Sequence, residues 1–326
     1  MKRRLKPATT GGNAFRLGCT ARLAYNFVVL KKLLPLLALG FALTGCIEFE
    51  RQTVTYEHDA KADTLHIHQT YHGLYGADDV TQLSEQEREQ LASVMKGQRT
   101  FFFANWIFEL NKEGFEKGII EAADPKNEPL EEAFRRAQTN LLTLFIANVR
   151  VENGKFYLGE KGRPCGTQRV TLRNVSKILG AGNELMRRGL ELEIKSKESA
   201  AERELIHASL TRPGPFFTLT GQQLRFRFPL SKAEFDKSTD SDEKLRHFIA
   251  EFVRQGGAMS HENGEIHLRF GRTDATRETV TLPMAGKESY RDNALAHIRD
   301  TYGLTKDFDP KKDMEEFLRA KAASKK

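Results

Sequence analysis

The chain has 326 residues, with 51 lysine and arginine residues against 44 aspartate and glutamate residues, and a formal net charge of +7. Such an excess of positive charge is typical of nucleic-acid-binding proteins, but eight of the basic residues and no acidic residue lie within residues 1–45. The remainder holds 43 basic and 44 acidic residues, a net charge of −1, so we expect no binding to nucleic acid.

An export signal is predicted near the N-terminus. Lys31 and Lys32 precede the apolar run 33–43, which is far shorter than the ~20 residues that span a bilayer. The run ends in Leu43-Thr44-Gly45-Cys46. In this position the four residues resemble the lipobox of bacterial lipoprotein precursors. In that family the cysteine is acylated and becomes the first residue of the mature chain.

The resemblance implies that residues 1–45 form a lipoprotein signal peptide and that residues 46–326 form the mature protein. Cys46 is then the lipidation site, which attaches the protein to membrane lipid in the cell envelope through stably anchoring acyl chains. Ile47 follows the cysteine and, in a host with two membranes, implies sorting to the outer membrane, facing the periplasm. The alternative is an ordinary secretory signal with an unrelated cysteine.

The region before Lys31 is longer than the basic segment that normally opens a signal peptide. Val28, Val29 and Leu30 stand directly before the two lysines. We therefore expect translation to begin near Val29 or Leu30, at a GTG or TTG codon.

Of the three cysteines, Cys19 precedes the predicted cut and Cys46 is the predicted lipid site, which leaves Cys165 alone in the mature domain. No intramolecular disulfide can form there, and a domain of this size needs none. Cys165 lies in the glycine- and proline-rich stretch 162–166, which predicts a loop. The adjacent Arg163 could lower the pKa of its thiol, whereas a small residue filling a turn is the simpler interpretation.

The first mature elements are predicted from alternation and capping. Val54 and Tyr56 alternate with polar residues, as do Leu65 and Ile67, which predicts a hairpin around residues 59–63. The capping box Ser84-Glu85-Gln86-Glu87 predicts the start of a helix. Residues 101–110 place only apolar side chains at their even positions, and we expect a core strand, with an aromatic ligand platform as the alternative.

Pro129 predicts the start of a helix, since proline is tolerated in the first turn. The segment 149–158 then contains Asn153-Gly154, the pair that favours a type I′ turn. Closing a hairpin there would set Val151 opposite Phe156. The sequence therefore predicts a two-stranded hairpin within these ten residues.

The second half of the chain alternates predicted helices and hairpins. A subdomain boundary is predicted at 212–215, where Arg212-Pro213-Gly214-Pro215 ends a helix. The predicted elements are helices over 175–193 and 198–210, a hairpin from 216–220 and 224–230, a helix over 244–254, an Asn263-Gly264 hairpin, a strand over 280–282, and helices over 294–301 and 313–322. Hairpins interspersed with helices predict an α+β fold with mainly antiparallel sheet.

Four of the nine histidines fall between His58 and His72. His66 and His68 share one face of a predicted strand, a geometry that binds zinc, and His58 or His72 could add a third nitrogen. The same pattern is produced by the solvent-exposed face of an amphipathic hairpin. Arg225 and Arg227 similarly predict either a small basic patch or a solvated sheet face.

Two functions follow from these observations. The first is a non-enzymatic lipoprotein that binds or scaffolds another envelope protein or ligand, with no cofactor. The second is a lipid-anchored, metal-dependent hydrolase that uses zinc at His58, His66 and His68. No Walker A, GxSxG, HExxH or CxxC motif is present, which favours the first. We assign no catalytic residue.

Overall fold

A computed structural model gives the structure of the chain. It describes residues 47–76, 84–95, 116, 119, 129–197, 199–241, 243–283, 299–300 and 303–323. Cys46, the predicted lipidation site, and the strand predicted over 101–110 lie outside the described residues, as does most of the helix predicted over 294–301.

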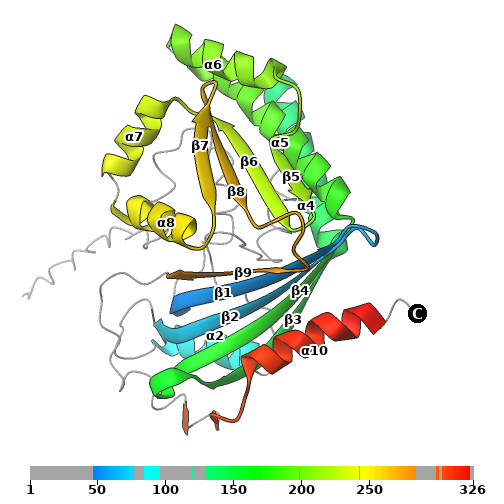
Figure 1. Cartoon of the computed structure of the whole chain (residues 1–326), viewed down its shortest axis with the longest axis vertical. Coiled ribbons are helices and arrows are strands. Elements are labelled where there is room, and N and C mark those ends of the chain that lie inside the picture. The colour runs from blue at the N-terminus through cyan, green and yellow to red at the C-terminus, as the bar shows by residue number, and fades with distance from the viewer. Residues whose placement is uncertain are drawn as a thin grey trace, which may run out of the picture.

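The fold is α+β, as predicted, and its strands form two antiparallel sheets (Figure 1). In the described part of the chain the strands are β1 (Ile47–Asp59), β2 (Thr64–Gly76), β3 (Val149–Leu158), β4 (Pro164–Arg173), β5 (Phe217–Thr220), β6 (Gln223–Pro229), β7 (Ala258–Glu262), β8 (Glu265–Phe270) and β9 (Glu278–Pro283). The five-stranded sheet has the order β3-β4-β2-β1-β9, and the four-stranded sheet has the order β5-β6-β8-β7.

Helices flank both sheets (Figure 1). The described helices are α2 (Glu85–Met95), α4 (Pro129–Asn148), α5 (Val175–Ser196), α6 (Ala200–Thr211), α7 (Lys232–Ser241), α8 (Glu243–Arg254) and α10 (Pro310–Ala323). The predicted capping box is confirmed: Ser84 N donates to Glu87 Oε2 at 2.8 Å, and Glu87 N donates to Ser84 Oγ at 3.3 Å. Among the described residues no helix combines the length and apolarity needed to cross a bilayer.

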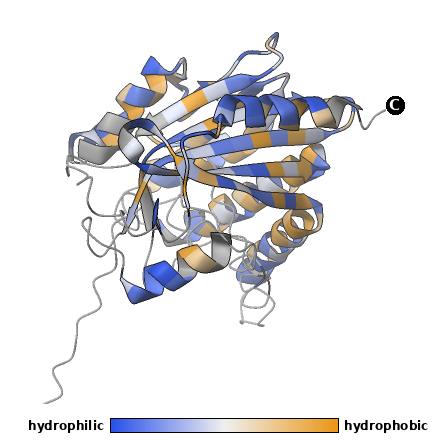
Figure 2. Cartoon of the chain, turned by 90° about the horizontal axis from the view of Figure 1, so that it is seen from below, coloured by the Kyte–Doolittle hydropathy of each residue, from blue (hydrophilic) through white to orange (hydrophobic). Residues whose placement is uncertain are grey.

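The predicted hairpin of β1 and β2 is confirmed and lies at the centre of the larger sheet. Its turn is held by Asp59, whose Oδ1 accepts hydrogen bonds from Lys61 N and Ala62 N at 3.0 Å each. Apolar and polar residues alternate along the strands, as Figure 2 shows in orange and blue. One face of the hairpin is therefore apolar and the other is polar.

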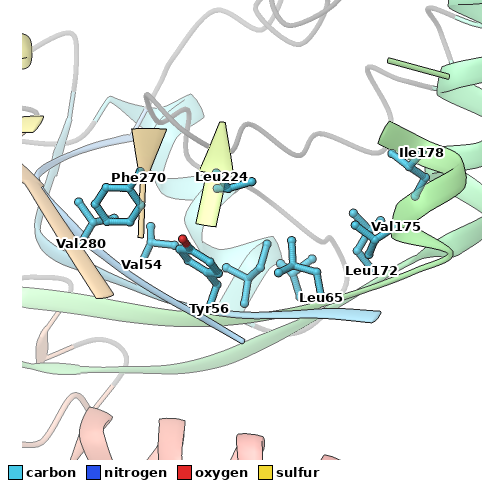
Figure 3. Close-up of a cluster of buried hydrophobic side chains, with 11 residues drawn as sticks. Val54, Tyr56, Leu65, Leu172, Val175, Ile178, Leu224, Phe270 and Val280 are labelled. Carbon is cyan, nitrogen blue, oxygen red and sulfur yellow. The ribbon is translucent and has the colours of Figure 1, made fainter. Parts of the chain in front are cut away.

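The apolar face of the larger sheet forms the main core against the smaller sheet and the first turns of α5. In Figure 3 these side chains lie on one side of the sheet, and α10, the faint red ribbon, lies on the other. The core comprises Val54, Tyr56, Leu65, Ile67, Val170, Leu172, Val175, Ile178, Leu224, Phe270 and Val280. Residues before and after the predicted boundary at 212–215 thus share one core.

Gln222, in the turn between β5 and β6, fastens the smaller sheet to the end of β1. Its backbone oxygen accepts a hydrogen bond from the Tyr56 hydroxyl at 2.6 Å. Its side-chain amide accepts from His58 N at 2.6 Å and donates to His58 O at 3.0 Å. The amide thus pairs with the backbone of β1 as another strand would.

The prediction of a hairpin within 149–158 is wrong, because these residues form the single strand β3. β3 pairs along its length with β4, so Val151 lies opposite Val170 rather than Phe156. Neither Asn153 nor Gly154 has the positive φ of a type I′ turn, and the register shifts between Asn153 and Phe156 as in a β-bulge. A longer ladder with β4 therefore outweighs the local turn preference.

The second predicted Asn-Gly hairpin is confirmed. Asn263 and Gly264 have φ values of 52° and 78°, as a type I′ turn requires, and β7 pairs with β8 across them. The two Asn-Gly pairs therefore differ in their surroundings. β4 pairs with the residues before and after Asn153-Gly154, whereas the residues before and after Asn263-Gly264 pair with each other.

Gly154 offers a test of the bulge. A Cβ at this position would lie 2.0 Å from Thr167 Oγ1 and 2.8 Å from Thr167 O. We predict that Gly154→Ala lowers the free energy of unfolding by about 1–3 kcal/mol, measured by urea denaturation. Gly180→Ala is the control, because it adds a Cβ in a helix with nothing within 4 Å, and it should raise stability by about 0.5–1 kcal/mol. Equal effects of the two changes would contradict the close packing of β3 on β4.

Candidate functional site

The histidines of the predicted metal site lie on two faces of the sheet. His66 and His68 point to the polar face of β2, whereas His58 pairs with Leu65 and lies on the apolar face. His58 Nδ1 is 3.0 Å from Gly221 O. The structure therefore does not bring His58 together with the other two. In the described ranges no three His, Cys, Asp or Glu side chains are grouped as a metal would need.

The alternative interpretation of His66 and His68, as a solvent-exposed surface, is wrong. His66 is 6% exposed and His68 is 2% exposed, because α10 packs across this face of the sheet (Figure 1). Phe317 of α10 lies with its ring centroid 6.0 Å from that of His66 and 6.5 Å from that of His68. The sequence pattern could not show that α10 covers this strand, because His68 and Asp313 are 245 residues apart in the chain.

Asp313 of α10 is the centre of the polar contacts beneath the helix. His68 Nε2 donates to Asp313 Oδ2 at 2.9 Å, and Arg169 of β4 donates to Asp313 Oδ1. The Arg169 guanidinium also lies 5.8 Å from the centroid of the Phe317 ring. We call Asp313, His68 and Arg169 the helix latch, since they join α10 to β2 and β4.

The electrostatics of the latch favour an ionised carboxylate. Burial alone would raise the pKa of Asp313, but hydrogen bonds and charge from His68 and Arg169 outweigh it and lower the pKa. Both carboxylate oxygens are occupied by these donors. Asp313 is thus suited to holding α10 in place rather than to moving a proton.

The remaining polar face of the larger sheet is satisfied by contacts between neighbouring strands. The hydroxyls of Thr53 and Thr281 are 3.0 Å apart, and those of Thr55 and Thr279 are 2.8 Å apart, which joins β1 to β9. Thr53 Oγ1 is also 3.0 Å from His72 Nε2. Burial, followed by the charge of Arg51, lowers the pKa of His72 to about 4, so this imidazole is neutral at pH 7.

Cys165 lies opposite His72 in the sheet, and two predictions about it are wrong. It occupies β4 rather than a loop, because the chain reverses earlier, at the short helix η2 (Glu160–Gly162). Burial raises the pKa of its thiol, which contradicts the alternative in which the nearby Arg163 lowers it. A buried, neutral thiol of this kind is a poor nucleophile.

A row of amides crosses the other face of the same strands. Gln52 Nε2 donates to Gln69 Oε1 at 2.6 Å, and the Tyr71 hydroxyl lies 2.7 Å from Gln69 Oε1 and 2.8 Å from Gln168 Oε1. Gln52 and Gln69 are fully buried, yet Gln52 Oε1 and Gln69 Nε2 have no hydrogen-bond partner.

The predicted basic patch of Arg225 and Arg227 does not form. Arg225 is exposed, but Arg227 is buried and forms an ion pair with Glu265 at 2.7 Å. Glu265 is fully buried and is also bound by Arg212 and Ser209. Arg227 further donates to Gly214 O at 2.6 Å and to Pro215 O at 3.1 Å, which fixes the proline-rich turn. The sequence pattern did not single out Glu265, because the arginines that bind it lie 38 and 53 residues earlier in the chain.

Comparison of the chain with protein-family models, with curated proteins and with solved structures found no match.

The helix latch generates a pH-dependent prediction. Because the folded-state pKa of Asp313 is lowered, its stabilisation is present above the unfolded pKa of about 4 and is lost as pH falls through the folded value. We predict that Asp313→Asn lowers the free energy of unfolding by about 3 kcal/mol at pH 7. The difference between wild type and variant should shrink towards pH 3, as followed by urea denaturation.

Glu315→Gln on the same helix is the control. Glu315 pairs with Arg277 at 2.8 Å, but both side chains are more than a third exposed to solvent, so the cost should stay below about 1 kcal/mol. An Asp313→Asn variant as stable as wild type at pH 7 would show that the latch does not hold α10.

Proposed function

We propose that the protein is a lipid-anchored cell-envelope protein whose α+β domain binds or scaffolds another envelope component. The observation that carries this proposal is the order of the N-terminal segment: Lys31 and Lys32, the short apolar run 33–43, and Leu43-Thr44-Gly45-Cys46 at its end. This order resembles that of a lipoprotein signal peptide, in which everything before the cysteine is removed.

The proposed anchor has a physical consequence for the domain. Two or three acyl chains on Cys46 would make attachment stable, because one chain alone binds a bilayer only marginally. One residue of extended chain spans only about 3.5 Å, so the start of β1 would lie at the membrane surface. Ile47, rather than an aspartate, supports sorting to the outer membrane in a host with two membranes, with the domain facing the periplasm.

Binding is favoured over catalysis by the state of the polar groups in the described domain. Asp313 is engaged by two donors, His72 is neutral at pH 7, and Cys165 is a buried thiol with a raised pKa. The metal-dependent hydrolase would need His58 or His72 beside His66 and His68. His58 lies on the opposite face of the sheet, and the described residues contain no group of three His, Cys, Asp or Glu side chains that could hold a metal ion. We therefore retain the binding function.

The anchor is tested by Cys46→Ser in the full chain. This change removes the thiol that would accept the diacylglyceryl group, and the lipoprotein peptidase of the family cuts only the modified cysteine. We predict that uncut precursor accumulates and that the variant takes up no alkyne-labelled fatty acid. Both are read by labelling cells and comparing precursor and mature bands on gels.

Cys19→Ser is the matched control, because it removes a cysteine that lies before the predicted cut. It should mature and take up label as wild type does. Normal maturation of Cys46→Ser, or an unacylated N-terminus in the mass spectrum of the wild-type protein, would overturn the anchor.

A further inference from the structure

One face of the four-stranded sheet lies in the core. The opposite face is exposed around Arg225 and Arg269, and we call this exposed part the open face; farther along the same face, Arg227 and Glu265 are buried beside the turn at 212–215. Leu224, Phe226 and Phe270 belong to the core side. On the other side, Thr218, Arg225, Arg269 and Ala258 stand in one row across β5, β6, β8 and β7. Arg225, Arg269 and Ala258 are exposed, so the middle of this row is accessible to solvent.

The row places two arginines directly opposite each other, Arg225 on β6 and Arg269 on β8. Arg225 donates from Nε to Gln223 Oε1 at 2.5 Å, and within the described part of the chain neither guanidinium is paired with a carboxylate. The nearest acidic residue along β8 is Glu265, four residues or about 13 Å from Arg269.

The arginines around this row are neutralised. Arg212 and Arg227 share the carboxylate of Glu265, and Arg272, just beyond β8, pairs with Glu278 at 3.1 Å. The two central arginines therefore leave a local charge of +2 on the open face. Like charges directly opposite each other destabilise a sheet, so the pair breaks a local rule of sheet design. Such exceptions are concentrated at functional sites.

We propose that the open face binds the phosphate group of a soluble phosphate monoester between Arg225 and Arg269. Each planar guanidinium can donate two parallel hydrogen bonds to phosphate oxygens, and a monoester at pH 8 has the two negative charges that match the pair. Thr218 lies next to Arg225 in the row and offers a hydroxyl donor. An isolated pair fits one dianion, whereas a lipid surface is bound by larger clusters of basic residues.

The test is calorimetric titration of phenyl phosphate into the full mature protein in neutral detergent at pH 8 and low salt. We expect saturable binding that Arg225→Thr and Arg269→Thr each weaken about tenfold or more. Binding should also weaken below pH 6, where the monoester gains a proton. Because each change removes a like-charge contact and introduces a good strand residue, neither should lower the unfolding midpoint.

Arg150→Thr is the matched control: Arg150 is an exposed strand arginine on β3 that already pairs with Glu152 at 2.8 Å. Its loss should leave phenyl phosphate affinity within about twofold of wild type, since only screened, distant charge is removed. Absence of saturable binding, or equal weakening by all three changes, would overturn the site. Binding of phosphatidic acid vesicles without binding of phenyl phosphate would overturn the soluble monoester in favour of a membrane surface.

Discussion

The β1–β2 hairpin is covered on both faces, and the rest of the structure is arranged around that burial. Its apolar face meets the smaller sheet and α5, which is the hydrophobic contribution to the fold. Its polar face lies under α10, where Asp313 receives hydrogen bonds from His68 and Arg169. Burying polar groups costs free energy unless they are paired. The hairpin can therefore be buried on this face because Asp313 of α10 pairs with His68 and Arg169.

Local features of the sequence predicted most of the elements. The β1–β2 hairpin, the capping box at Ser84 and the Asn263-Gly264 turn depend on residues that are close in the chain, and each is confirmed. The hairpin predicted at Asn153-Gly154 is wrong because β4 pairs with the residues on both sides of this dipeptide. The Asn-Gly pair favours a turn only through local conformational free energy, and the hydrogen bonds between β3 and β4 contribute more than that preference.

The candidate sites were less predictable, since each depends on contacts between distant residues. His68 was recognised as unusual, but its partner Asp313 lies 245 residues later and no spacing rule connects them. The role of Glu265 depends on Arg212 and Arg227, which precede it by 53 and 38 residues and surround it only in the folded sheet. The pairing of Arg225 with Arg269 likewise requires the register of β6 on β8, which the sequence pattern alone does not fix.

The position of β9 beside β1 bears on when this protein can fold. Thr53 and Thr281, which join the two strands, are separated by 228 residues. During synthesis the edge of β1 stays open until β9 has emerged, so the larger sheet is completed only when most of the chain exists. A chain that crosses a membrane before folding benefits from that order, because no finished domain forms near its leading end to obstruct passage. The late completion of the sheet would therefore suit the export that the N-terminal segment predicts.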